Sequence, residues 1–143
     1  MAYKKYGISL APEVAAQIEQ RIDRAGDRSP VINRQLERYF SILERARREL
    51  RLILSDQELG LIVDALTGKS FQDTFSVYFV GLEVIEAINF DRLDHKHTVD
   101  NPALIEKMVA LTDMQRVALV DAVHVWRNRQ VKGEKPDYTD VLM

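Results

Sequence analysis

The sequence has no cysteine, only 6 glycines and 4 prolines in 143 residues, and no long apolar run. The absence of cysteine excludes a disulfide framework, cysteine-ligated zinc and thiol catalysis, and it suits a reducing cytoplasm. No apolar run approaches the roughly 18 residues that span a bilayer. The first residues, MAYKKYGISLAPE, lack the apolar region of a signal peptide. We therefore expect a cytoplasmic protein without membrane contact.

Catalytic motifs are also missing. The sequence contains no glycine-rich phosphate loop, no Gly-x-Ser-x-Gly and no His-Glu-x-x-His. Its serines, histidines and aspartates show no spacing that indicates a triad. Trp126 and the aromatic residues of 71–90 are predicted to belong to the core rather than to a cofactor site. The expectation is a protein that is not an enzyme and has no cofactor.

Charge is present but unevenly distributed. The net charge of the chain is −2. Residues 1–54 carry 11 Lys and Arg against 7 Asp and Glu, whereas residues 55–143 carry 9 against 15. A basic first third followed by an acidic remainder indicates two functional parts and makes nucleic acid a candidate partner of the first.

The basic part begins with an alternating segment over 5–10, typical of a half-buried strand. Its apolar side chains would share one face, and its polar side the other: Tyr6, Ile8 and Leu10 against Lys5, Gly7 and Ser9. Helical spacing then predicts a helix over 12–25 that Gly26 ends. Ser29 as N-cap and Pro30 as first residue predict a second helix reaching about residue 51.

The acidic part is predicted to be entirely helical. Two capping boxes, Ser55 with Glu58 and Thr112 with Gln115, each indicate a helix start. The predicted segments are a helix from the first box to before Gly68, a central buried helix in 70–90, a polar connection from Asp91 to Asp100, a helix over 101–110, a helix from the second box to about 130, and a flexible tail over 131–143.

A single short strand is not stable alone, because its backbone groups need a partner. The economical solution is a dimer in which two copies pair as an antiparallel ribbon, with Tyr6, Ile8 and Leu10 entering a shared core together with Ile32 and Leu36. Such a ribbon fits the major groove of DNA. The expected fold class is mostly α: an N-terminal ribbon-helix-helix followed by an all-α C-terminal domain.

The order of these pieces resembles a known family. Residues 4–43 are similar to the ribbon-helix-helix superfamily of DNA-binding repressors, the MetJ/Arc/CopG group. The resemblance is carried by three stretches: Lys5-Tyr6-Gly7-Ile8-Ser9-Leu10, then Ala11-Pro12-Glu13-Val14, then Gly26-Asp27-Arg28-Ser29 ahead of Ile32, Leu36 and Tyr39. It covers under a third of the chain, and the C-terminal part resembles no family that we identify.

The resemblance implies specific DNA contacts. The base-reading positions of the family correspond to Lys5, Gly7 and Ser9, and its phosphate clamp corresponds to Arg28 and Ser29. Lys4, beside the strand, is expected to contact phosphate as well. Two features depart from the family pattern. Gly7 has no side chain with which to read a base, and the following proline, Pro30, removes one amide from the clamp.

One further cluster contains possible metal ligands. Asp91, Asp94, His95 and His97 lie in one polar segment, and His124 lies on the last predicted helix. His95 and His97 are the better candidates, but a solvated loop explains the pattern more simply, so we expect no metal site.

The sequence thus predicts a regulator of transcription that binds double-stranded DNA as a homodimer or higher oligomer and associates with the nucleoid. Residues 1–53 would bind DNA and dimerise, residues 54–130 would bind a partner or effector, and residues 131–143 would form the tail. Two alternatives stay open. One is an antitoxin whose C-terminal part binds a partner protein, and the other is a dimeric interaction module without DNA binding.

Overall fold

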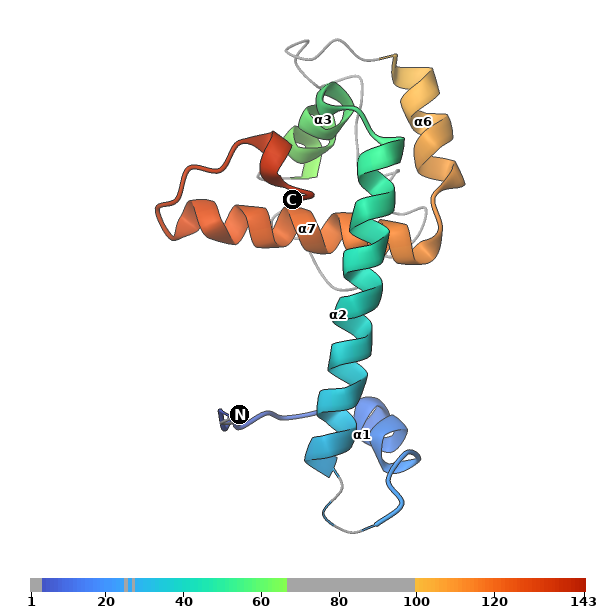
Figure 1. The fold of residues 1–143 in the computed structure, drawn as a ribbon, viewed down its shortest axis with the longest axis vertical. Coiled ribbons are helices and arrows are strands. Elements are labelled where there is room, and N and C mark those ends of the chain that lie inside the picture. Colours follow the sequence, from blue (N-terminus) through green and yellow to red (C-terminus); the bar gives the residue numbers. More distant parts are fainter. Residues whose placement is uncertain (1–3, 25, 27, 67–99) are drawn as a thin grey trace. The chain divides into compact units, whose positions relative to one another are not determined.

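Helices make up the regular structure of the described residues, as Figure 1 shows. The computed structural model describes residues 4–24, 26, 28–66 and 100–143. Its elements are α1 (Pro12–Glu19), α2 (Arg28–Ile53), α3 (Asp56–Leu66), α6 (Asn101–Ala110), α7 (Asp113–Val131) and the short 3-10 helix η2 (Tyr138–Asp140). The predicted mostly α composition is confirmed for this part of the chain. The predicted helix within 70–90 and the polar connection that follows lie outside it, up to residue 99.

The prediction of an N-terminal strand is wrong. Residues 4–11 contain neither strand nor helix, and the described residues form no sheet, so the expected ribbon-helix-helix with its intermolecular ribbon is not the fold observed. The physical reason lies in the backbone. A strand exists only as part of a ladder, and no second extended segment among the described residues offers its amides and carbonyls to this one. All residues of 4–11 are exposed instead.

The first helix is shorter than predicted. α1 ends at Glu19 rather than near residue 25. The Arg21 side chain donates to the backbone carbonyl of Gln17 at 2.6 Å and to its side chain at 3.0 Å, which satisfies an acceptor that a continuing helix would have bonded. Gly26 does adopt a positive φ of 94°, but it does so within the turn before α2 rather than directly after the helix.

The second helix begins at Arg28, two residues earlier than the predicted first residue, Pro30. Because α2 starts at Arg28, Ser29 and Pro30 both lie in its first turn, where a missing amide costs no intrahelical bond. The helix then continues to Ile53, close to the predicted end. Apolar side chains recur along one stripe of α2 at helical spacing: Ile32, Leu36, Tyr39, Leu43, Ala46 and Leu50.

The chain divides into two compact units, residues 1–40 and 41–143. The sequence prediction placed a boundary between residues 53 and 54. The division falls within α2 because Leu43, Ala46 and Leu50 are buried in the core of the second unit. The first unit comprises the N-terminal segment, α1 and the first half of α2. Val31 is the only buried apolar side chain among its described residues.

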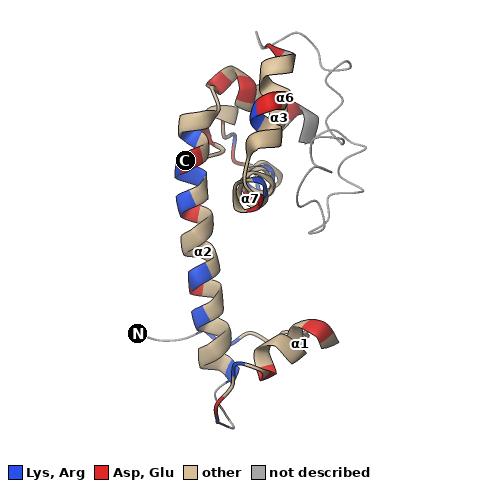
Figure 2. Ribbon diagram, turned by 90° about the vertical axis from the view of Figure 1, so that its right-hand side faces the viewer, with Lys and Arg blue, Asp and Glu red and all other residues tan. Residues whose placement is uncertain are grey.

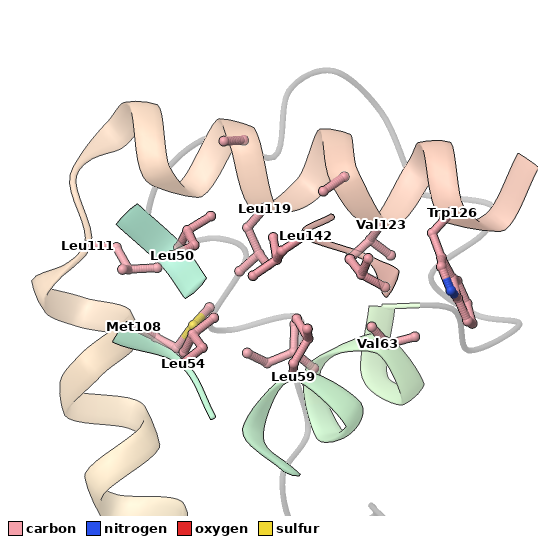
Figure 3. Packing of buried hydrophobic residues seen from close by; sticks show 14 of the residues in the cluster. Leu50, Leu54, Leu59, Val63, Met108, Leu111, Leu119, Val123, Trp126 and Leu142 are labelled. Carbon is pink, nitrogen blue, oxygen red and sulfur yellow. The ribbon is translucent and has the colours of Figure 1, made fainter. Parts of the chain in front are cut away.

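The second unit has a continuous apolar core. α3 packs against α7 and η2, and α6 contributes Leu104 and Met108. Figure 3 shows Leu119, Val123 and Trp126 of α7 directed toward the side of α3 that carries Leu59 and Val63. Burial of these side chains supplies the main stabilisation of the unit.

Both predicted capping boxes are confirmed. The Ser55 hydroxyl accepts from the Glu58 amide at 3.2 Å, and the Glu58 carboxylate accepts from the Ser55 amide at 2.9 Å. Thr112 and Gln115 form the same reciprocal pair ahead of α7, at 3.2 and 2.9 Å. These local bonds fix where each helix begins, so the sequence alone located both starts.

The end of the predicted flexible tail packs into the core. Val141 and Leu142 are buried within the second unit. The indole nitrogen of Trp126 donates to the carbonyl of Asp137 at 2.8 Å, and Arg47 of α2 approaches the carbonyl of Met143 at 3.4 Å. Gly133 and the proline after it turn the chain back toward α7 rather than releasing it, and this return depends on tertiary contacts that composition does not reveal.

Candidate functional site

The N-terminal segment is a polar, accessible stretch of chain. Lys4, Lys5 and Ser9 are exposed, and nothing lies within 4 Å of where a side chain on Gly7 would begin. No residue of 4–10 forms a backbone hydrogen bond with another described residue. The segment therefore presents two ammonium groups, a hydroxyl and unpaired backbone groups to solvent, all of which can bind a polyanion.

Arg28, the predicted phosphate ligand, already has an anionic partner. Its Nε lies 2.7 Å from Oε1 of Glu19 at the end of α1, and both side chains are more than half exposed. The hydrogen bond and the charge of Glu19 raise the pKa of Arg28 above its ordinary value. The pair joins the end of α1 to the start of α2, which explains how the turn between them is held.

This pair limits what the first turn of α2 can bind. Free amides at a helix N-terminus and the helix dipole attract an anion. Ser29 is exposed there, whereas Pro30 has no amide to offer. A phosphate would compete with Glu19 for the Nε of Arg28, and this exchange costs little free energy because exposed ion pairs are weak.

A second basic feature lies along α2, and sequence reasoning missed it. The helix contains seven arginines, three glutamates and no lysine. Arg34, Arg38, Arg45 and Arg48 are spaced by four, seven and three residues, so they share one face, which we call the arginine face. Blue bands recur along α2 in Figure 2. A helical wheel of 28–51 would have found this face, because it lies opposite the apolar stripe.

No described carboxylate forms an ion pair with the arginine face. The salt bridges of the described residues include Arg28 but none of the four arginines of this face. Glu37, Glu44 and Glu49 are on the same helix, yet none lies within 4.0 Å of them. Glu49 is engaged elsewhere, since it accepts from Gln115 at 2.8 Å. The arginine face thus carries four accessible guanidinium groups.

Apolar side chains of the first unit are also accessible. The predicted dimer-core residues Tyr6, Ile8, Leu10 and Leu36 are exposed, and Ile32 is half-buried. Phe40 is 59% exposed, and its ring lies 5.6 Å from that of Tyr39. Along one apolar stripe of α2, therefore, Leu50 is fully buried while Leu36 is 46% exposed. The first unit by itself does not cover its own apolar surface.

Other candidate chemistry finds little support. His95 and His97, with Asp91 and Asp94, lie outside the described residues; within the described ranges, no three His, Asp or Glu side chains gather as a metal site would require. His124 is exposed on α7, where its ring lies 3.4 Å from the Asn128 amide. In the same ranges, no helix is both long and apolar enough to cross a bilayer.

Comparison with known proteins found no matching family model, no matching curated protein and no matching solved structure.

Proposed function

We propose that the chain is a DNA-binding regulator of transcription that acts as a homodimer in the cytoplasm, on the nucleoid. The N-terminal unit would supply both the pairing surface and the DNA contacts. The observation that carries this proposal is a 40-residue unit with 7 Lys and Arg against 5 Asp and Glu, in which several large apolar side chains are exposed. The two parts of the proposal follow from two physical arguments.

The first argument concerns size. Units of about 40 residues rarely bury enough apolar surface to fold without a metal, a disulfide or a partner. This chain has no cysteine, and Val31 is the only buried apolar side chain among the described residues of 1–40. A second copy is the simplest partner, because it brings the same exposed apolar residues, Leu36, Tyr39 and Phe40, to a self-complementary interface.

The second argument concerns charge. Pairing two first units would bring together two regions with 7 Lys and Arg against 5 Asp and Glu each, whereas the acidic excess of the chain lies in residues 41–143. Lys4, Lys5 and Arg28 are exposed and can contact phosphates, which dominate the affinity of proteins for DNA. Lys5 and Ser9 can also reach base edges, which would provide sequence preference.

The Arg28–Glu19 pair provides a sharp test of the phosphate contact. Because Glu19 competes with phosphate for Arg28, Glu19→Gln should tighten DNA binding, and Arg28→Gln should weaken it and reduce its salt dependence. Glu13→Gln is the matched control, since it removes the same charge from α1 without touching Arg28. Fluorescence anisotropy of the full chain on a labelled duplex, at two salt concentrations, measures all three.

The expected order of affinity is Glu19→Gln above Glu13→Gln, with Arg28→Gln weakest. Equal affinities for the two glutamate variants, together with an unchanged Arg28→Gln, would remove Arg28 from the interface. If the unmodified chain binds no duplex at low salt, the alternatives remain: an interaction module, or a partner-binding protein that co-purification would reveal.

A further inference from the structure

The arginine face of α2 is not used by the contacts proposed so far. Those contacts come from the N-terminal segment and the first turn of α2. Arg34 lies nearly two turns further along the helix, and Arg48 lies four turns beyond that. The face is accessible along this length, and Ser41, between Arg38 and Arg45, is exposed as well.

The composition of the arginine face favours phosphate as a ligand. Every basic residue of α2 is an arginine. A guanidinium group binds phosphate through two parallel hydrogen bonds, whereas a lysine ammonium acts as a point charge. A helix that only needed solubility would gain as much from pairs of glutamate and lysine at i, i+4 spacing. Four arginines without an ion pair to a described residue instead form a surface suited to several phosphates.

The length of the face matches duplex DNA. Fourteen residues of α-helix separate Arg34 from Arg48, which corresponds to about 21 Å at a rise of about 1.5 Å per residue. The major groove is about 12 Å wide. A helix of this length can therefore contact phosphates on both sides of the groove, or several along one strand.

We infer that the arginine face of α2, formed by Arg34, Arg38, Arg45 and Arg48, is a second DNA-contacting surface that binds the phosphate backbone without reading sequence. The inference rests on the proposed DNA-binding function and adds a site to it. It assigns to the helix a positioning contact that increases affinity equally for all sequences.

The test compares paired substitutions in the full chain. Arg34→Gln/Arg38→Gln and Arg45→Gln/Arg48→Gln each remove two charges from the face, and glutamine keeps a good helix propensity. Lys132→Gln/Lys135→Gln is the matched control, because it removes two exposed charges elsewhere. Circular dichroism and thermal melting verify that each variant is folded before its affinity is measured on random-sequence and genomic duplexes.

Each face variant should weaken binding to every duplex by roughly tenfold or more. The slope of log affinity against log salt should fall by about one for each phosphate that the variant no longer neutralises. The lysine control should change neither quantity. Folded face variants that bind DNA as tightly as the control would overturn the inference while leaving the proposed function intact. A weakening confined to one preferred sequence would overturn it too, because it would indicate base reading.

If the unmodified chain binds no duplex, the proposed function and this inference both fail. An unmodified chain that binds DNA and loses affinity only on Lys4→Gln/Lys5→Gln or Arg28→Gln would support the proposed function alone. The two failures are therefore distinguished by one set of titrations.

Discussion

The apolar stripe of α2 allows the proposed pairing to be tested with two substitutions of the same kind. Leu36 and Leu50 lie on one stripe of one helix, but Leu50 is fully buried and Leu36 is 46% exposed. Leu50→Ala removes side-chain packing within a single chain. Leu36→Ala removes packing that, in our proposal, only the second copy completes.

The two substitutions are expected to change different quantities: Leu50→Ala the stability of the single chain, and Leu36→Ala the affinity of the dimer. Leu50→Ala should destabilise the chain by about 3 to 5 kcal/mol, since it leaves a cavity in a closed core. Full burial of a leucine contributes about 1.5 to 3 kcal/mol. Because Leu36 is 46% exposed, about half of this, roughly 1 kcal/mol, remains to be gained at each Leu36 on pairing. Two copies give about 2 kcal/mol, so Leu36→Ala should raise the dimer Kd about thirtyfold.

The assay is thermal unfolding at several protein concentrations, together with sedimentation velocity. The decrease in Tm caused by Leu50→Ala should be nearly independent of concentration. Leu36→Ala should shift the monomer–dimer midpoint to higher concentration and lower Tm most where the unmodified chain is dimeric. A Leu36→Ala chain with unchanged sedimentation and unchanged Tm at every concentration would refute the pairing surface.

Three further predictions concern stability, each measured by chemical or thermal unfolding. Burial alone would raise the pKa of Glu58, but hydrogen bonds from Lys107 and Ser55 and the Lys107 charge lower it below 4.5. Glu58→Gln should therefore lower the free energy of unfolding by about 1 kcal/mol at pH 7. This difference should shrink as the pH falls below 4.5, because a carboxylate of lowered pKa stabilises the fold only while it is ionised. A difference that does not change with pH would contradict this. Gly26→Ala should lower the free energy of unfolding by about 1 kcal/mol or more, because the φ of Gly26 is +94°. Gly7→Ala should leave it unchanged, because Gly7 has no positive φ. Equal effects of the two substitutions would refute the backbone strain at Gly26. Leu142→Ala should cost about 2 to 5 kcal/mol, whereas an unpacked tail would tolerate it.

Local signals in the sequence were reliable where they are completed by neighbouring residues. Ser55 with Glu58 and Thr112 with Gln115 form reciprocal bonds three residues apart, and Asp100 caps α6 by accepting from the Ala103 amide. Such bonds need no tertiary partner, so the pattern is sufficient to predict them. The continuity of α2 was likewise readable from its strong helix formers.

Signals that depend on distant residues failed or were absent. Alternation in 5–10 indicates a strand, but a strand requires a ladder that the described residues do not supply. The docking of the last residues depends on Trp126 of α7, whose indole nitrogen donates to the carbonyl of Asp137. From the sequence alone, a stretch that contains glycine and proline indicates a flexible end, because the surface against which it packs is not known.

Parts of the candidate site could be located from the sequence, but their electrostatic state could not. The exposed lysines at positions 4 and 5 are where charge counting placed them. The partner of Arg28 was not foreseen, because Glu19 lies nine residues away across a turn whose geometry decides the contact. The spacing of the arginines in α2 is sufficient to predict the arginine face. Only the structure shows that no described carboxylate forms an ion pair with it.

The most direct test of the central claim is the composition of a complex between the full chain and duplex DNA. Native mass spectrometry or sedimentation at low salt should give two chains, or a multiple of two, per bound duplex, and the affinity should fall steeply as salt rises. A chain that remains monomeric and unbound at micromolar concentration and low salt, on genomic and random duplexes alike, would contradict the account.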